Sequence, residues 1–129
     1  MFLLDTNICI DFVDGRNAVA QQRVREHHAR GLEISAITAA ELLVGPKSSD
    51  DPAGDRQKVQ TFLSLVTVHD FDGRAAEAYG DIVRAFGVKR SSFDRLIAAH
   101  ALSLNLTLVT ANVKDFRDIE DLRIADWTQ

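Results

Sequence analysis

The sequence has 129 residues, of which 46% are hydrophobic and 26% charged, a balance typical of a folded globular protein rather than a disordered or fibrous one. This length suits one core, so we expect a single domain spanning residues 1–129. The formal net charge of −4 argues against nonspecific coating of nucleic acid, which needs a broad basic face, but it does not exclude a local basic rim.

The sequence also argues against a protein held by disulfides or a thiolate zinc site, and against a membrane-spanning protein. A single cysteine, Cys9, leaves no internal disulfide and no thiolate zinc site. No apolar run approaches the roughly 20 residues that cross a bilayer, and the chain does not start with a basic segment followed by a long apolar one. We therefore expect a cytoplasmic protein with no membrane partner.

The first half of the chain alternates apolar strands with helices. In order, we expect a strand at 2–4, helices at 7–13 and 17–30, a strand at 33–38, a helix at 39–45 and a loop at 46–54. The first strand runs straight into Asp5, and Asn17 is the expected cap of a polar surface helix.

The second half continues the alternation. We expect a helix at 55–63, a strand at 65–68, helices at 72–86 and 91–104, a strand at 106–110, a turn at 119–122 and a weak strand at 123–125. An apolar stripe from Ala75 to Phe86 predicts a core-facing helix, and 91–104 is apolar on several sides and therefore largely buried. Strands joined through helices imply right-handed parallel crossovers. The predicted fold is α/β, with three layers (α/β/α) around a mainly parallel sheet of four to five strands.

Three acids follow the carboxyl ends of strands or begin helices in this arrangement. Asp5 follows the first strand, Glu41 is expected in the first turn after the second, and Asp94 in the first turn of the buried helix. Because these ends lie on one side of a parallel sheet, Asp5 and Glu41 are predicted to approach each other. Helix capping is the alternative: Asp5 as an N-cap, and capping boxes at 38–41 and 91–94, explain each acid singly.

Capping leaves unexplained why Asp94 should begin a helix built mainly of Leu, Ile and Ala, where an unpartnered charge is costly. A divalent cation supplies a partner, and several carboxylates with water suit Mg²⁺ or Mn²⁺. The loop after the strand at 106–110 reaches the same edge, where Asn112 or Asp115 is a candidate fourth group. Such a site activates water and neutralises charge on a phosphodiester.

The stretches 2–7, 37–42, 94–101 and 108–116 resemble the successive motifs of PIN-domain ribonucleases, most closely the VapC-type toxins of bacterial toxin–antitoxin pairs. The resemblance covers nearly the whole chain in the right order. It implies an endoribonuclease in which Asp5, Glu41 and Asp94 bind Mg²⁺, with Mn²⁺ able to substitute, and an ion-activated water attacks the RNA. Thr6 and Thr110 become supporting residues.

The sequence departs from the family at two positions. The fourth acidic position falls on Asn112, or its role passes to Asp115, so one metal ion is expected and a second is left open. Phe93 stands where the family often has Asn before the third acid. The resemblance also implies a homodimer and a VapB-like antitoxin that inserts a segment across the cleft.

Basic residues around these motifs are candidates to hold RNA phosphates beside the acids, with a solvated surface as the alternative. They are Lys89, Arg90, Arg95, Lys114 and Arg117. Two other functions were weighed. A receiver-type phosphoacceptor module needs paired acids after the first strand and a Lys after the fifth, and this chain has Asp5 alone and no such Lys. A catalytically silent PIN-like binding scaffold would bind no metal.

Overall fold

The computed structural model describes residues 1–46, 48–88 and 93–129. Its strands are β1 (Phe2–Leu4), β2 (Glu33–Ser35), β3 (Thr67–His69), β4 (Thr107–Val109) and β5 (Ile124–Ala125). Its helices are α1 (Thr6–Asp14), α2 (Ala18–His28), α3 (Ala36–Val44), α4 (Pro52–Leu65), α5 (Gly73–Phe86) and α6 (Asp94–Leu104), with a short 3₁₀ helix, η1 (Val113–Asp115). Among these residues, no helix is long and apolar enough to cross a membrane.

The strands form one five-stranded sheet in the order β3-β2-β1-β4-β5, and every neighbouring pair is parallel. β1 lies at the centre, with Leu3 opposite Leu108 on one side and Glu33 on the other. The α/β fold class and the parallel sheet are thus confirmed. Because all strands point the same way, everything that follows a strand begins at the same edge of the sheet.

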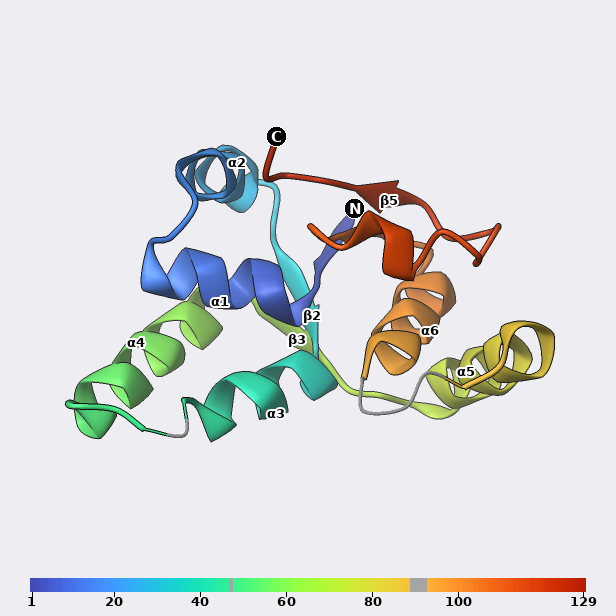
Figure 1. Ribbon diagram of the computed structural model, residues 1–129, viewed down its shortest axis with the longest axis horizontal. Helices are drawn as coiled ribbons and strands as arrows, with labels where there is room; N and C mark the ends of the chain where they lie inside the picture. The colour runs from blue at the N-terminus through green and yellow to red at the C-terminus, as the bar shows by residue number, and fades with distance from the viewer. Residues whose placement is uncertain (47, 89–92) are drawn as a thin grey trace.

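Helices cover both faces of the sheet (Figure 1). Each face of the sheet has its own hydrophobic core, because successive side chains of β1 point to opposite faces. Leu4 packs with residues of α1, α2, α3 and α4, whereas Leu3 packs with residues of α5 and α6. On β4, Val109 joins the first core and Leu108 the second. A strand buried on both faces reads as a continuous apolar run, as residues 2–4 do.

Two predicted boundaries are wrong because a cap outweighs periodicity. β2 ends at Ser35, not at residue 38, since the Ser35 hydroxyl accepts a hydrogen bond from the Ile37 N–H at 3.0 Å and starts α3 at Ala36. Similarly, Asp51 caps α4 by accepting from the Gly54 N–H, and Pro52 occupies the first turn, so the helix begins inside the predicted loop.

The predicted stripe on α5 is correct for its first part only. Ala75 and Ile82 are buried, but Phe86 at its end is 40% exposed. The buried helix is confirmed as α6, in which residues 97–101 are all buried.

Truncating Leu108 to Ala should lower the free energy of unfolding by about 2–5 kcal/mol, because Leu108 is fully buried in a central strand and the truncation leaves a cavity. Urea unfolding followed by the fluorescence of Trp127, the chain's single tryptophan, measures it. Leu65→Ala, at a 48% exposed residue, is the control. Equal losses in the two variants would contradict the described core.

Candidate active site

Asp5 lies at the carboxyl end of β1 and is only 2% exposed. Its carboxylate caps α1, with Oδ1 accepting a hydrogen bond from the Ile8 N–H at 2.9 Å. The Thr110 side chain is a second hydrogen-bond partner of this carboxylate. Thr110 directly follows β4, whose Val109 pairs with Leu4, so the parallel register brings Asp5 and Thr110 together.

Burial raises the pKa of Asp5 from 3.8 to about 6, and this is the largest influence on the group. The hydrogen bonds from Thr110 and Ile8 lower the pKa, while the negative charges of Asp94 and Asp11 raise it. Asp94 is thus an electrostatic neighbour of Asp5. At neutral pH, Asp5 is a buried carboxylate close to a second acid.

Glu41 is joined to the same place through Thr6, the first residue of α1. The Thr6 hydroxyl is 2.6 Å from Glu41 Oε1 and 3.1 Å from Thr38 Oγ1. A carboxylate can only accept, so Thr6 donates its one proton to Glu41 and receives the proton of Thr38. This hydrogen bond joins Glu41 to the residue that follows Asp5, while the approach of Asp5 and Glu41 themselves stays a prediction.

The capping-box alternative is wrong for Glu41 and stays a prediction for Asp94. Since α3 begins at Ala36, Glu41 lies in its second turn and Thr38 is not the cap. α6 begins at Asp94, with Phe93 as its N-cap and no capping hydrogen bond from that side chain. The predicted capping box at 91–94 includes residues 91 and 92, which lie outside the described residues. The capping role predicted for Asp5 is confirmed.

The loop after β4 is anchored by Thr110, whose hydroxyl oxygen accepts the Asn112 N–H at 3.0 Å. Asn112 is half-buried and precedes η1, in which Asp115 is also half-buried. Both candidates for the fourth position therefore lie on the loop that leaves β4 next to Asp5.

The predicted RNA-binding basic residues differ in their exposure to solvent. Arg95 is 3% exposed, and its guanidinium forms a two-point ion pair with Asp118 at 3.1 and 2.7 Å. It ties α6 to the C-terminal turn instead of facing solvent, so the structure contradicts its prediction as a phosphate contact. Lys114 and Arg117 are exposed. Lys89 and Arg90 lie outside the described residues.

The described ranges contain no group of three or more His, Cys, Asp or Glu side chains close enough to hold a metal ion. Glu41 is directed at the Thr6 hydroxyl, while Asp5 and Asp94 interact. The donors still suit a hard cation, because Mg²⁺ is commonly held by one or two carboxylates, substrate phosphates and several waters. Asp5, a buried charge beside a like charge, is a group that a cation would stabilise.

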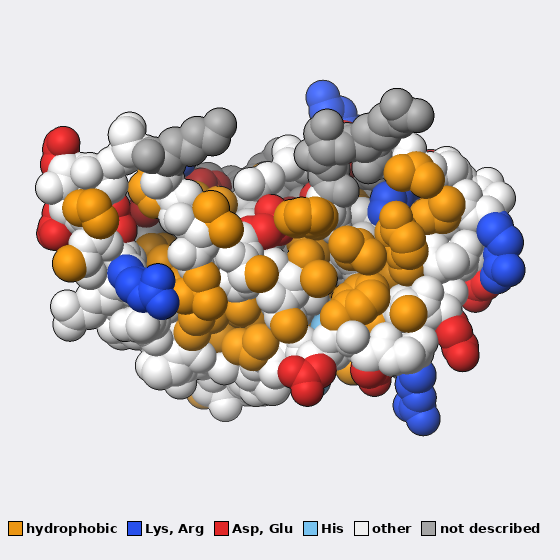
Figure 2. Space-filling view, turned by 90° about the horizontal axis from the view of Figure 1, so that it is seen from below, with side chains coloured by type: hydrophobic (Ala, Val, Ile, Leu, Met, Phe, Trp, Pro, Cys, Tyr) orange, Lys and Arg blue, Asp and Glu red, His pale blue; other side chains and the backbone are white. Residues whose placement is uncertain are grey.

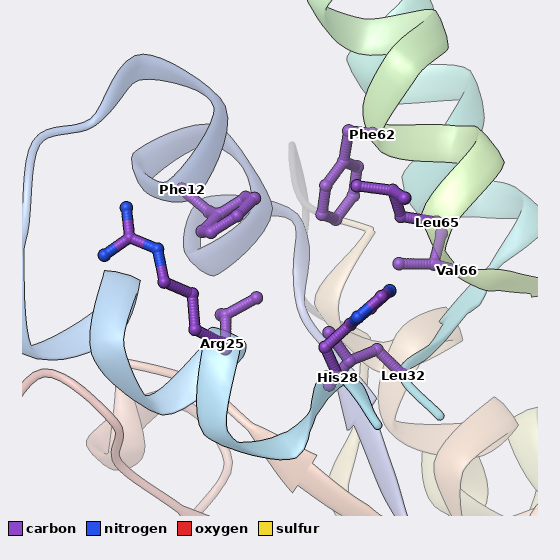
Figure 3. A pocket seen from close by; sticks show the side chains of 8 residues that line it. Phe12, Arg25, His28, Leu32, Phe62, Leu65 and Val66 are labelled. Atoms are coloured by element: carbon purple, nitrogen blue, oxygen red, sulfur yellow. The ribbon is translucent and has the colours of Figure 1, made fainter. Parts of the chain in front are cut away.

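A separate hollow of about 190 Å³ lies between α1, α2 and α4. Figure 3 shows Phe12 and Phe62 facing each other across it, with Arg25 and His28 contributed by α2. Leu32 and Val66, which line it, directly precede β2 and β3. The hollow is therefore at the opposite end of the strands from Asp5 and has no acidic lining, so it is not the acid site.

Comparison with known proteins identifies the family of the chain. The pattern of the family described as "PIN domain" matches residues 2–122. The chain belongs to the PIN domain family. This membership overturns the receiver alternative.

Relatives of this PIN domain match it over almost their full length. The tRNA(fMet)-specific endonuclease VapC of Shigella flexneri is 34% identical, with 98% of each chain covered. Among solved structures, DNA-bound VapBC from Salmonella typhimurium has a TM-score of 0.86 at 35% identity, covering 98% of this chain and 97% of that one. VapBC2 from Rickettsia felis, bound to a promoter DNA fragment, also has a TM-score of 0.86, at 30% identity with 98% of each chain covered.

Thr38 was missed as a site residue. It is fully buried, and its hydroxyl supports Thr6 as Thr6 supports Glu41. Its position three residues before Glu41 was a usable signal, because residues i and i+3 share a face of a helix. The signal was read as a capping box because the helix start was placed too late.

Asp5→Asn should stabilise the metal-free protein at pH 7.5 by about 3 kcal/mol, because an amide removes the buried charge while still able to cap α1. The raised pKa gives the sign of the pH dependence. The stabilising effect of protonating Asp5 is complete below about pH 4 and is lost as the pH rises through about 6.

Thermal melting in EDTA between pH 4 and 8 measures this difference. Wild type should lose stability across that window relative to Asp5→Asn, and Glu77→Gln, at an exposed acid on α5, should follow wild type. If Asp5→Asn melted at a lower temperature than wild type at pH 7.5, burial of the charged Asp5 carboxylate would not be destabilising.

Proposed function

We propose that this PIN domain is a divalent-metal-dependent endoribonuclease of the VapC type, in which Asp5, Glu41 and Asp94 bind the ion. The observation that carries the proposal is the buried Asp5 carboxylate, with its pKa raised to about 6 and the charge of Asp94 beside it. A buried carboxylate with a like charge beside it is stabilised by a cation or by taking up a proton. The relatives named as ribonucleases and endonucleases support the reaction class.

Each residue has a part that follows from its surroundings. Asp5 is held immobile by Ile8 and Thr110, so it offers a fixed ligand. Asp94 approaches from the start of α6, and Glu41 is oriented by Thr6. When bound, Mg²⁺ or Mn²⁺ would lower the pKa of a water and neutralise charge on the phosphodiester in the transition state.

Asn112 and Asp115 complete the edge of the site on the loop after β4. An amide at 112 adds no negative charge, which is why one ion, rather than two, is proposed. Lys114 on the same loop is exposed and suited to hold an RNA phosphate next to the acids. Two relatives are named tRNA(fMet)-specific endonucleases, so initiator tRNA is the first substrate to test.

We also propose that a VapB-like antitoxin partners this chain, as it does in the VapBC structures to which the fold is similar. A homodimer is the second assembly proposed. Figure 2 shows a band of hydrophobic side chains across the face on which α3 and α5 lie. The exposed apolar residues of these two helices include Leu43 and Val44 at the end of α3 and Phe86 at the end of α5. Exposed apolar bands of this kind mark protein interfaces.

Cleavage of initiator tRNA, and of a pool of cellular RNA, should require Mg²⁺ and stop in EDTA. Asp94→Asn should lower the rate about 100-fold or more, because the site then lacks a charged ligand. Asp121→Asn, at an exposed acid of the C-terminal turn, should cleave like wild type. Cleavage that survives both the chelator and the Asp94 substitution would sink the mechanism. Absence of Mn²⁺ binding by wild type would favour the silent scaffold.

Val44→Glu should shift the proposed dimer toward monomer in sedimentation velocity, because Val44 is 82% exposed at the end of α3 and a charge there opposes burial. Val19→Glu on α2, at a 40% exposed position, is the matched control. Dissociation by both variants, or by neither, would argue against a dimer through the α3 and α5 face.

A further inference from the structure

The two helices that carry Glu41 and Asp94 pack against each other, and a buried hydrogen bond joins them. His100 Nδ1 on α6 lies 2.7 Å from Oγ of Ser35, the residue that caps α3. Ser35 is fully buried and His100 is 1% exposed. Water therefore does not compete for this contact, and either group would be costly to leave without a partner.

The proton positions follow from the partners. Ser35 Oγ accepts the Ile37 N–H at 3.0 Å, and its one proton is left to donate to His100 Nδ1. The ring then carries its proton on Nε2, where the backbone of Asp70, the second hydrogen-bond partner of His100, can accept it. One neutral imidazole thus connects α6, the start of α3 and the segment after β3.

The neighbours of the ring keep it in this form and place. The rings of His69 and Phe71 stand edge-on to it, with centroids at 6.1 and 5.3 Å. Burial lowers the pKa of His100, and nearby His69 lowers it further, against an opposing effect of Asp72. At neutral pH the imidazole is therefore uncharged and confined by aromatic rings.

The distances along the helices connect this bond to the acids. Glu41 lies six residues beyond Ser35 on α3, and Asp94 six residues before His100 on α6, which is about 9 Å of helix in each case. A short helix segment moves as a rigid unit, so a shift at the Ser35–His100 bond is transmitted to both carboxylates. The proposed reaction gives His100 no direct chemical part.

We infer that Ser35 and His100 are positioning residues of the acid site: their hydrogen bond sets the start of α3 against α6 and so sets the placement of Glu41 relative to Asp94. The inference rests on the proposed function, because it concerns the same acids. It assigns a role to a buried histidine that lies outside the acid cluster.

The test uses Ser35→Ala, His100→Asn and their double variant in the full chain. Asn keeps a polar group near the Nδ1 position, and it leaves the Ser35 cap of α3 intact. Ser103→Ala is the matched control. Ser103 Oγ donates a hydrogen bond at 2.8 Å to the His100 carbonyl within α6, so this substitution removes a hydroxyl contact that does not join the two helices. Mn²⁺ affinity without RNA is measured by titration calorimetry, alongside melting temperature, kcat and KM.

Ser35→Ala should weaken Mn²⁺ binding and lower kcat by about tenfold each, the usual scale for groups that orient ligands, while KM for RNA stays unchanged. His100→Asn should show a smaller effect of the same kind. The double variant should show the same Mn²⁺ affinity and kcat as Ser35→Ala, because both substitutions remove one and the same hydrogen bond.

The inference would be overturned if both single variants kept the Mn²⁺ affinity and kcat of the wild type while their melting temperatures fell as in Ser103→Ala. That result would leave the proposed function standing. Additive losses in the double variant would also overturn it, since Ser35 would then act only as a helix cap. If Ser35→Ala fails to fold, His100→Asn decides alone. A wild type that neither binds Mn²⁺ nor cleaves RNA would overturn the proposed function itself.

Discussion

The burial of the Asp5 carboxylate is the constraint on which the rest of the site depends. Asp5 follows the central strand of a sheet covered on both faces, so water hardly reaches it. The Ile8 N–H, the Thr110 side chain and the start of α1 offset part of the cost, yet the pKa still rises to about 6. The fold thus maintains a carboxylate in a place that disfavours its charge, and the proposed cation would relieve this cost.

The sheet brings supporting polar groups to this acid. Parallel pairing of β1 with β4 brings Thr110 to Asp5, and α1 presents Thr6 to Glu41 one residue later. The ion pair of the buried Arg95 with Asp118 fixes the start of α6 to the C-terminal turn, next to Asp94. A rigid scaffold of this kind places ligands more precisely than mobile loops would, because each orienting side chain is itself held by packing and hydrogen bonds.

Local signals predicted the elements well where a single force decided them. Apolar runs located β1 and β4, and Asn17 was correctly placed as the cap of α2. The errors came where two local signals competed. Residues 33–38 alternate like a strand, but Ser35 caps a helix, and the cap prevails because Ala36 to Val44 can bury one face against α1 and α6. That error moved Glu41 into the wrong turn and made Thr38 look like a cap.

The sequence alone determined the α/β alternation, the parallel sheet and the place of Asp5 at the end of its first strand, because hydrophobic periodicity and strand endings are local properties of the chain. Only the tertiary structure decided which polar groups support those acids. Arg95 was predicted as a phosphate-binding cation, yet its side chain is buried and pairs with Asp118. His100 lies within the predicted buried helix and hydrogen-bonds Ser35. Their partners lie 23 and 65 residues away, and no local pattern encodes a contact at that separation. Asp5 itself was visible from the first strand, but its raised pKa depends on how completely the helices exclude water from it.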